Sequence, residues 1–166
     1  MSDYWLDADS LITPHRGPYP FGMVQPFWDF IETKAQDGII SSPQIILDIE
    51  LTATSTSNPP DALQQWAKGL KGVLFIPVDN SIQISYSQVV DYVQNCGKYK
   101  QQWIAQFLAG ADPWVIAYPM AMGGRIVTFE KSQPRAKRPK IPDIANHFGV
   151  KHFSLYEMLK KLGFKL

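Results

Sequence analysis

The sequence predicts an α/β fold with a mainly parallel sheet, and two observations support this prediction. Short apolar runs typical of buried strands alternate with amphipathic helical patterns along the chain, which is the arrangement of parallel strands connected by helices. The chain has 166 residues, of which 45% are hydrophobic, and this is enough for one substantial core. We therefore expect a single domain over residues 1–166.

The first half of the chain starts with a strand and returns to strands twice. The expected elements are, in order, a strand at 3–7, a helix around 27–35, a strand at 38–42, a helix at 43–51, a helix at 58–70 and a strand at 72–79. The helix at 43–51 opens with Pro43, which suits a first helical turn. The helix at 58–70 carries Leu63, Trp66 and Leu70 at spacings of three and four residues.

The second half is richer in helices. The expected elements are helices around 86–93, around 103–108 and at 111–124, a strand at 125–130, and helices at 142–149 and 154–163. Pro119 lies inside the third of these helices, and an interior proline costs about 3 kcal/mol and should kink it. Ser154 and Glu157 have the spacing of a capping box, and Gly163 ends the last helix. The stretches at 52–60 and 131–140 are expected to be the least ordered.

The composition limits the cellular setting. Cys96 is the only cysteine, so no internal disulfide can form and a reducing cytoplasm is expected. No apolar run reaches the roughly 18 residues of a membrane span, and the first residues do not resemble a secretory signal. The net charge of +1 favours no class of partner.

Four acidic residues, far apart in the sequence, are expected at one rim of the sheet. Asp7 and Glu130 each end a predicted strand, Asp112 opens a helix, and Asp48 lies in the helix after the second strand. Parallel α/β sheets form their sites at the carboxyl ends of the strands. Clustered carboxylates repel one another unless a cation compensates them, and Mg²⁺ or Mn²⁺ prefers such oxygen ligands. A metal there would polarise a phosphoryl oxygen and lower the pKa of a bound water, which becomes the nucleophile.

The segments "YWLDADSLI", "ISSPQIILDIEL" and "GADPWVIAYPMAMGGRIVTFE" together resemble the acidic framework of the PIN domain family of metal-dependent ribonucleases. The ending "IPDIANHFGVKHFSLYEMLKKLGF" also resembles that of a PIN domain, so the resemblance covers nearly the whole chain and is closest to a bacterial PIN-like branch. It implies a three-layer fold with helices on both faces of a sheet of four or five strands. The positions it matches are Asp7, Asp48, Asp112 and Glu130, with Thr128 before the last.

The same resemblance implies a function. The protein would be a cytoplasmic Mg²⁺- or Mn²⁺-dependent endoribonuclease acting on RNA, the toxin of a toxin–antitoxin pair held inactive by a small antitoxin protein. Members of the family often form homodimers. Two positions depart from the pattern: Glu130 replaces an Asp, and Asp48 stands where a Glu is usual. Glu50 competes with Asp48 for the second acid, but counting from Ser42 favours Asp48, and at about 100° per residue only one of the two should point inward.

Several further residues have a functional and a structural interpretation. Asp9 caps a turn or assists the metal site. Thr128 orients a carboxylate or suits a strand, and Arg16 grips a phosphate or belongs to a surface turn. His15 is expected at the surface. The basic segment 134–140 attracts an RNA backbone or is a solvated loop. The Trp and Phe residues recur at helical spacing, so they are expected in the core rather than in a base-stacking site.

Two other functions remain open from the sequence. A haloacid-dehalogenase-like phosphatase would use Asp7 as the nucleophile and Asp9 as the acid/base, because "DADSL" follows an apolar strand. A catalytically inactive PIN-like module would bind RNA or a protein instead.

Overall fold

The computed structural model describes residues 2–51 and 62–166 and has a five-stranded sheet at its centre. The strand order is β3-β2-β1-β4-β5, and every pairing between these strands is parallel. The strands are β1 (Tyr4–Leu6), β2 (Ile40–Pro43), β3 (Phe75–Ile76), β4 (Arg125–Val127) and β5 (His152–Phe153). Because β1 lies between β2 and β4, the strand order reverses beside it, which is where open α/β sheets form their sites.

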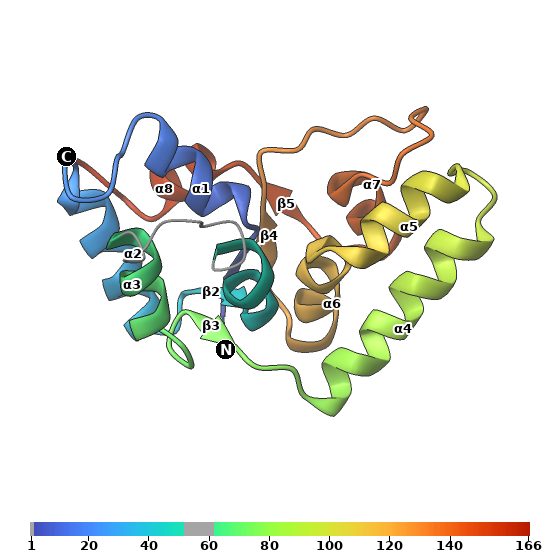
Figure 1. The fold of residues 1–166 in the computed structure, drawn as a ribbon, viewed down its shortest axis with the longest axis horizontal. Helices are drawn as coiled ribbons and strands as arrows, with labels where there is room; N and C mark the ends of the chain where they lie inside the picture. The colour runs from blue at the N-terminus through green and yellow to red at the C-terminus, as the bar shows by residue number, and fades with distance from the viewer. Residues whose placement is uncertain (1, 52–61) are drawn as a thin grey trace.

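Helices cover both faces of this sheet. They are α1 (Asp9–Arg16), α2 (Gln25–Gln36), the π-helical segment η1 (Ile46–Leu51), α3 (Ala62–Gly69), α4 (Asn80–Asn95), α5 (Gln101–Ala109), α6 (Asp112–Met122), α7 (Ile141–His147) and α8 (Leu155–Lys161). Figure 1 shows α1, α2, α3 and α8 on one side of the sheet and α4, α5, α6 and α7 on the other. The predicted α/β fold with a mainly parallel sheet is confirmed, and the three layers are consistent with a PIN-like fold.

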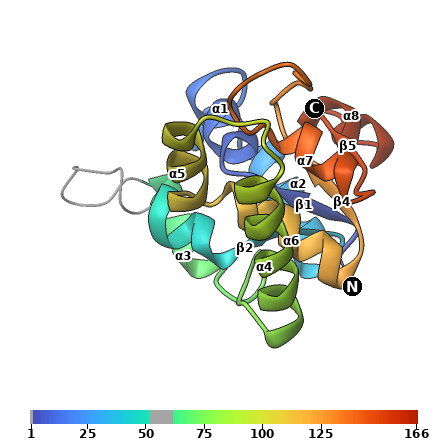
Figure 2. The same cartoon turned by 90° about the vertical axis from the view of Figure 1, so that its right-hand side faces the viewer.

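The core lies on both sides of β1. All three residues of that strand are buried, and Trp5 and Leu6 are fully so. Helix α6 packs against β1, β2 and β4, and Val115–Tyr118 are fully buried in it. Figure 2 shows α4 alongside α6, on the outside of this layer. Because α6 is held between the sheet and α4, its first residue has a fixed position at the rim of the sheet.

Some predicted boundaries were wrong. Residues 13–20 were considered a surface turn and no helix was expected before them, yet α1 runs from Asp9 through Pro14 to Arg16. The third strand is only Phe75–Ile76, since Gly72 at φ 84° turns the chain before it and Pro77 follows. Pro43 ends β2 instead of opening a helix.

Helix α6 continues past Pro119 and ends at two glycines, as expected for its end. The Gly123 N–H donates to the Pro119 carbonyl oxygen at 2.9 Å, and the chain then turns into β4. Gly124 has φ +101°, and a Cβ there would lie 2.7 Å from the Ser2 carbonyl oxygen. Only glycine fits this position without a shift of the neighbouring backbone.

Of the two segments expected to be least ordered, only 131–140 is among the described residues. Residues 52–60 lie outside the described residues. Segment 131–140 contains no helix or strand but is held at several points. The Ser132 hydroxyl and the Gln133 N–H donate to the Asp143 carboxylate, and the Lys100 N–H donates to the Lys137 carbonyl oxygen.

The capping box of Ser154 and Glu157 at the start of α8 is confirmed. None of the helices in the described part of the chain has the length and apolar character that a membrane span requires.

Candidate functional site

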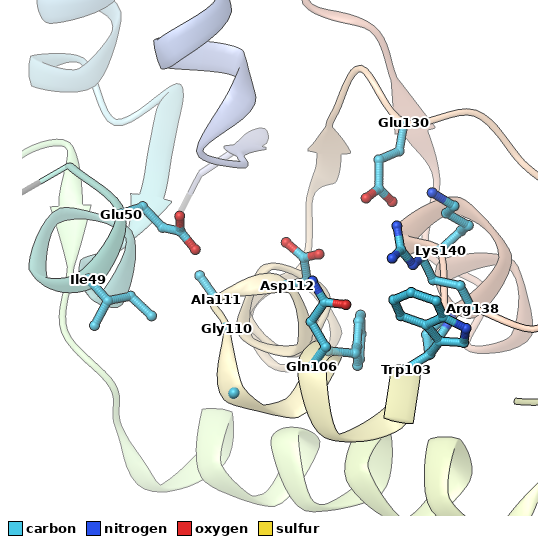
Figure 3. A pocket seen from close by; sticks show the side chains of 13 residues that line it. Ile49, Glu50, Trp103, Gln106, Gly110, Ala111, Asp112, Glu130, Arg138 and Lys140 are labelled. Carbon is cyan, nitrogen blue, oxygen red and sulfur yellow. The ribbon is translucent and has the colours of Figure 1, made fainter. Parts of the chain in front are cut away.

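A pocket of about 570 Å³ opens at the carboxyl edge of the sheet, next to the first turn of α6. Its lining comes from η1, α5, α6 and the segment after β4, so distant parts of the sequence meet there. Figure 3 shows the carboxylates of Glu50, Asp112 and Glu130 pointing into this space. The structure therefore brings acidic side chains from three separate elements to one pocket.

Asp7 lies deeper, directly after β1, and its side chain is only 3% exposed. The Asp7 N–H donates to the Val127 carbonyl oxygen, which ties this residue to β4. Its Oδ1 accepts hydrogen bonds from the Ser10 N–H at 2.9 Å and from the Ser10 hydroxyl at 2.7 Å. Asp7 therefore caps the start of α1. The cap occupies Oδ1.

Thr128 connects Asp7 to Glu130. This buried residue hydrogen-bonds the Asp7 carboxylate with its side chain, and its Oγ1 accepts from the Glu130 N–H at 3.1 Å. The structure thus gives Thr128 the orienting contact that the sequence suggested. A substitution that removes this hydroxyl would leave the Asp7 carboxylate with fewer donors in a buried place.

The pKa values of both Asp7 and Asp112 are raised above that of a free aspartate. Burial raises the pKa of Asp7 to about 6, although hydrogen bonds from Thr128 and Ser10 act in the opposite direction. Burial raises the pKa of Asp112 to about 7, and the negative charges of Glu130, Asp7, Glu50 and Asp9 add to this effect. The two carboxyl groups are therefore short of compensating positive charge, and a cation that joined them would restore their ionised form.

Glu50, and not Asp48, faces the pocket. A Cβ on Gly110 would lie 3.9 Å from Glu50 Oε1, which places this carboxylate beside the residues that lead into α6. Asp48 is exposed and does not line the pocket, so the preference for Asp48 was wrong as a prediction of orientation. The prediction assumed the rotation of an α-helix, whereas η1 is π-helical, with wider i→i+5 turns, and starts at Ile46 rather than at Pro43.

Glu130 lies three residues beyond the last residue of β4 and is half-buried. Its Oε2 accepts a hydrogen bond from the Ile141 N–H at 2.8 Å, so the side chain caps the start of α7. Glu130 also lines the pocket, together with Asp112. Glu130 therefore lines the pocket and caps α7 with the same side chain.

The part of the pocket lining opposite Glu50 is basic and aromatic. Arg138 and Lys140, from the basic segment, line the pocket together with Trp103 and Gln106 of α5. The Arg138 guanidinium lies 3.8 Å from the centre of the Trp103 ring system, which is a cation–π stack. Figure 3 shows Arg138 over Trp103, on the side of the pocket that carries Glu130.

The expectation that the tryptophans belong to the core is wrong for Trp103. Trp5 and Trp28 are fully buried, and Trp66 and Trp114 pack against the core clusters, whereas Trp103 is half-buried at the pocket. Its spacing with the buried Phe107, four residues later on the same helix face, resembles a core pattern and hid this role. The sequence carries no signal that pairs Trp103 with Arg138, because the two residues lie 35 positions apart.

The remaining candidates lie outside the pocket lining. Asp9 is exposed in the first turn of α1, and its charge reaches Asp7 and Asp112. Arg16 is exposed at the end of the same helix. His15 is half-buried, and its Nδ1 accepts from the Phe21 N–H at 3.1 Å, which is a structural role.

The donor set fits a hard divalent cation by its chemistry. Asp7, Glu50, Asp112 and Glu130 supply only oxygen atoms, and Asp112 senses the negative charge of the other three. Within residues 2–51 and 62–166, no three His, Cys, Asp or Glu side chains lie close enough to hold one ion together. A cation would therefore have to draw these carboxylates inward from the positions they have here.

The fold and this pocket define the protein as a three-layer α/β domain with an acidic site at the carboxyl edge of its sheet. Residues 4–166 match the family described as "Domain of unknown function (DUF4411)", and the chain belongs to that family. A search of curated proteins found no match.

Proposed function

We propose that this protein is a Mg²⁺- or Mn²⁺-dependent endoribonuclease whose site is formed by Asp7, Glu50, Asp112 and Glu130. The observation that carries the proposal is the pocket at the carboxyl edge of the sheet, into which Glu50, Asp112 and Glu130 point from three separate elements. Burial and the neighbouring carboxylates also raise the pKa of Asp112 in this pocket to about 7. Perturbed groups in a pocket are typical of functional sites. The resemblance to the PIN domain family supports the same four-acid arrangement, with Glu50 in place of Asp48.

Each acidic residue has a defined part in this proposal. Asp112, the first residue of α6, lines the pocket, and the buried Asp7 lies close enough for its negative charge to raise the pKa of Asp112. Glu50 and Glu130 close the two sides of the pocket. When bound, a divalent cation would neutralise these carboxylates and polarise the phosphodiester. Thr128 keeps the Asp7 carboxylate in place, and Arg138 and Lys140 attract the phosphate backbone.

The phosphatase alternative requires Asp7 to attack a phosphate directly. The structure buries Asp7 and directs two donors of Ser10 at its Oδ1, and it places Asp9 on an exposed turn. These contacts fit a carboxylate that stabilises the site better than a carboxylate that is free to attack a phosphate. A toxin role, with a small antitoxin as partner, follows from the resemblance alone and is part of the proposal on that basis.

The test is cleavage of a mixed single-stranded RNA pool by the purified full chain, with and without Mn²⁺. We expect cleavage that needs the cation and that Asp7→Asn and Asp112→Asn abolish. Asp91→Asn is the matched control, because Asp91 is exposed on α4 and lies outside the pocket lining. A folded protein that cuts no RNA in Mn²⁺ would contradict the proposal and favour an inactive binding module.

A further inference from the structure

The wall of the pocket opposite Glu50 has a feature that the proposed chemistry does not need. Trp103 is half-buried, and the Arg138 guanidinium lies on it at 3.8 Å from the ring centre. A surface arginine loses side-chain freedom when it is held flat on a ring, so such a stack is more ordered than a solvated basic loop requires. The backbone supports it, because the Lys137 carbonyl oxygen, next to Arg138, accepts from the Lys100 N–H at the start of α5.

This stack presents an outward-facing flat surface in a polar pocket. Arg138 is exposed although its guanidinium covers the indole, so one face of the guanidinium plane remains open. Planar guanidinium groups and aromatic rings are the surfaces on which proteins stack unpaired bases. Gln106 lines the same pocket and can donate to and accept from a base edge, and Lys140 supplies a further positive charge.

We infer that the Trp103–Arg138 stack is a binding site for one unpaired nucleobase beside the carboxylates of the pocket. This inference rests on the proposed function for the identity of the ligand. The base lies on the open face of the Arg138 guanidinium, with Trp103 supporting the other face, and Lys140 contacts the backbone phosphate. The cavity of about 570 Å³ is within the roughly 300–1,000 Å³ of small-ligand sites.

The geometry of the stack fits an unpaired base and not a base inside a duplex. In a duplex every base is already stacked between its neighbours and paired on its edge, so it cannot reach a guanidinium at the wall of a pocket. A single strand can turn one base outward at a small cost. Because stacking uses the face of a base, we expect tolerance of base identity, with little sequence preference.

The experiment measures binding without chemistry. A fluorescent single strand of about 12 nucleotides is titrated with the full-length protein in EDTA, and its anisotropy gives Kd; a duplex of the same sequence is the second probe. The variants are Arg138→Lys and Trp103→Leu. Arg138→Lys keeps the charge but removes the plane, and Trp103→Leu removes the support. Arg135→Lys is the matched control, since Arg135 is an exposed arginine of the same segment outside the pocket lining.

We expect Arg138→Lys and Trp103→Leu to raise the single-strand Kd roughly 5- to 100-fold, the range that loss of one stacked base gives. Arg135→Lys should change it by less than about threefold, because the charge is kept. Trp103→Phe, which retains an aromatic face, should recover most of the binding. Because Arg138 is exposed, its variant tests the stack even if Trp103→Leu does not fold.

Equal effects of Arg138→Lys and Arg135→Lys would overturn the inference, and so would equal affinity for the duplex. These outcomes are independent of the proposed nuclease activity, because no cation is present and no bond is cut. Binding that depends on Arg138 without any cleavage in Mn²⁺ would uphold the base site and remove the nuclease proposal. Cleavage without such dependence would do the reverse.

Discussion

At the residue scale, the central feature is that Asp112 occupies a place where its charge is unfavourable. Burial and four neighbouring carboxylates raise its pKa from 3.8 to about 7. An acid with a raised pKa in the folded state costs no stability below its unfolded pKa. The cost grows as the pH rises from about 4 to about 7 and is complete above that value. A cation bound beside this carboxylate would remove the cost.

Asp112→Asn should therefore make the metal-free protein more stable at high pH. We expect the free energy of unfolding in EDTA to rise by about 2 kcal/mol at pH 8, because the amide removes the repelled charge and keeps the shape. The gain should become much smaller towards pH 4, where the carboxyl is protonated in the folded state and partly protonated in the unfolded state. Urea unfolding at the two pH values measures this. A variant that is less stable than wild type at pH 8 would contradict an unfavourable charge at position 112.

Substitutions of Glu50 and Asp48 can be compared to decide which of the two residues is the second acid of the site. Glu50→Gln should lower metal-dependent cleavage by about 100-fold or more, since it removes a charge that lines the pocket. Asp48→Asn should leave cleavage within about threefold, because Asp48 is exposed away from the lining. Initial rates on the same labelled single strand compare them. The opposite ranking would restore the assignment that the sequence favoured.

At the element scale, helix ends with a local signal were easier to predict than short or irregular elements. The glycines after α6 and the capping box of α8 predicted the position of those helices well, because both signals act locally. The π-helical turn of η1 has no comparable sequence signal, and it decides which acid faces the pocket. Helix α1 was missed because its cap comes from Asp7, on the preceding strand end, rather than from its own first residues.

Glu130 connects an element to the site, so its two roles can be separated. Glu130→Ala removes the acceptor for the Ile141 N–H and should cost about 1 kcal/mol in the free energy of unfolding. Glu130→Gln keeps a carbonyl oxygen at that position and should cost less than half as much. Both variants should lose metal-dependent cleavage, because both lose the charge. Thermal unfolding beside the cleavage assay tests the pair, and equal destabilisation by Ala and Gln would rule out the capping role.

At the scale of the whole molecule, sequence order and sheet order together explain why the acids meet. The sequence showed that Asp7, Asp112 and Glu130 follow strand ends or open a helix. The sheet order β3-β2-β1-β4-β5 then brings β1 and β4 side by side. The basic and aromatic wall could not be predicted in the same way, because the contact of Arg138 with Trp103 joins an irregular segment to α5 across 35 positions of sequence.

The measurement that tests the central claim most directly is the thermal unfolding temperature of the full chain at pH 8, with and without Mn²⁺, for wild type and Asp112→Asn. At a concentration of about 100 times its Kd, a ligand of the folded state adds about 2.7 kcal/mol. For a chain of this length that is a rise in Tm of roughly 5–10 °C. We expect this rise in wild type and its loss in Asp112→Asn, with Asp48→Asn behaving as wild type. An unchanged Tm in wild type, or an equal rise in Asp112→Asn, would contradict a cation site built on these carboxylates.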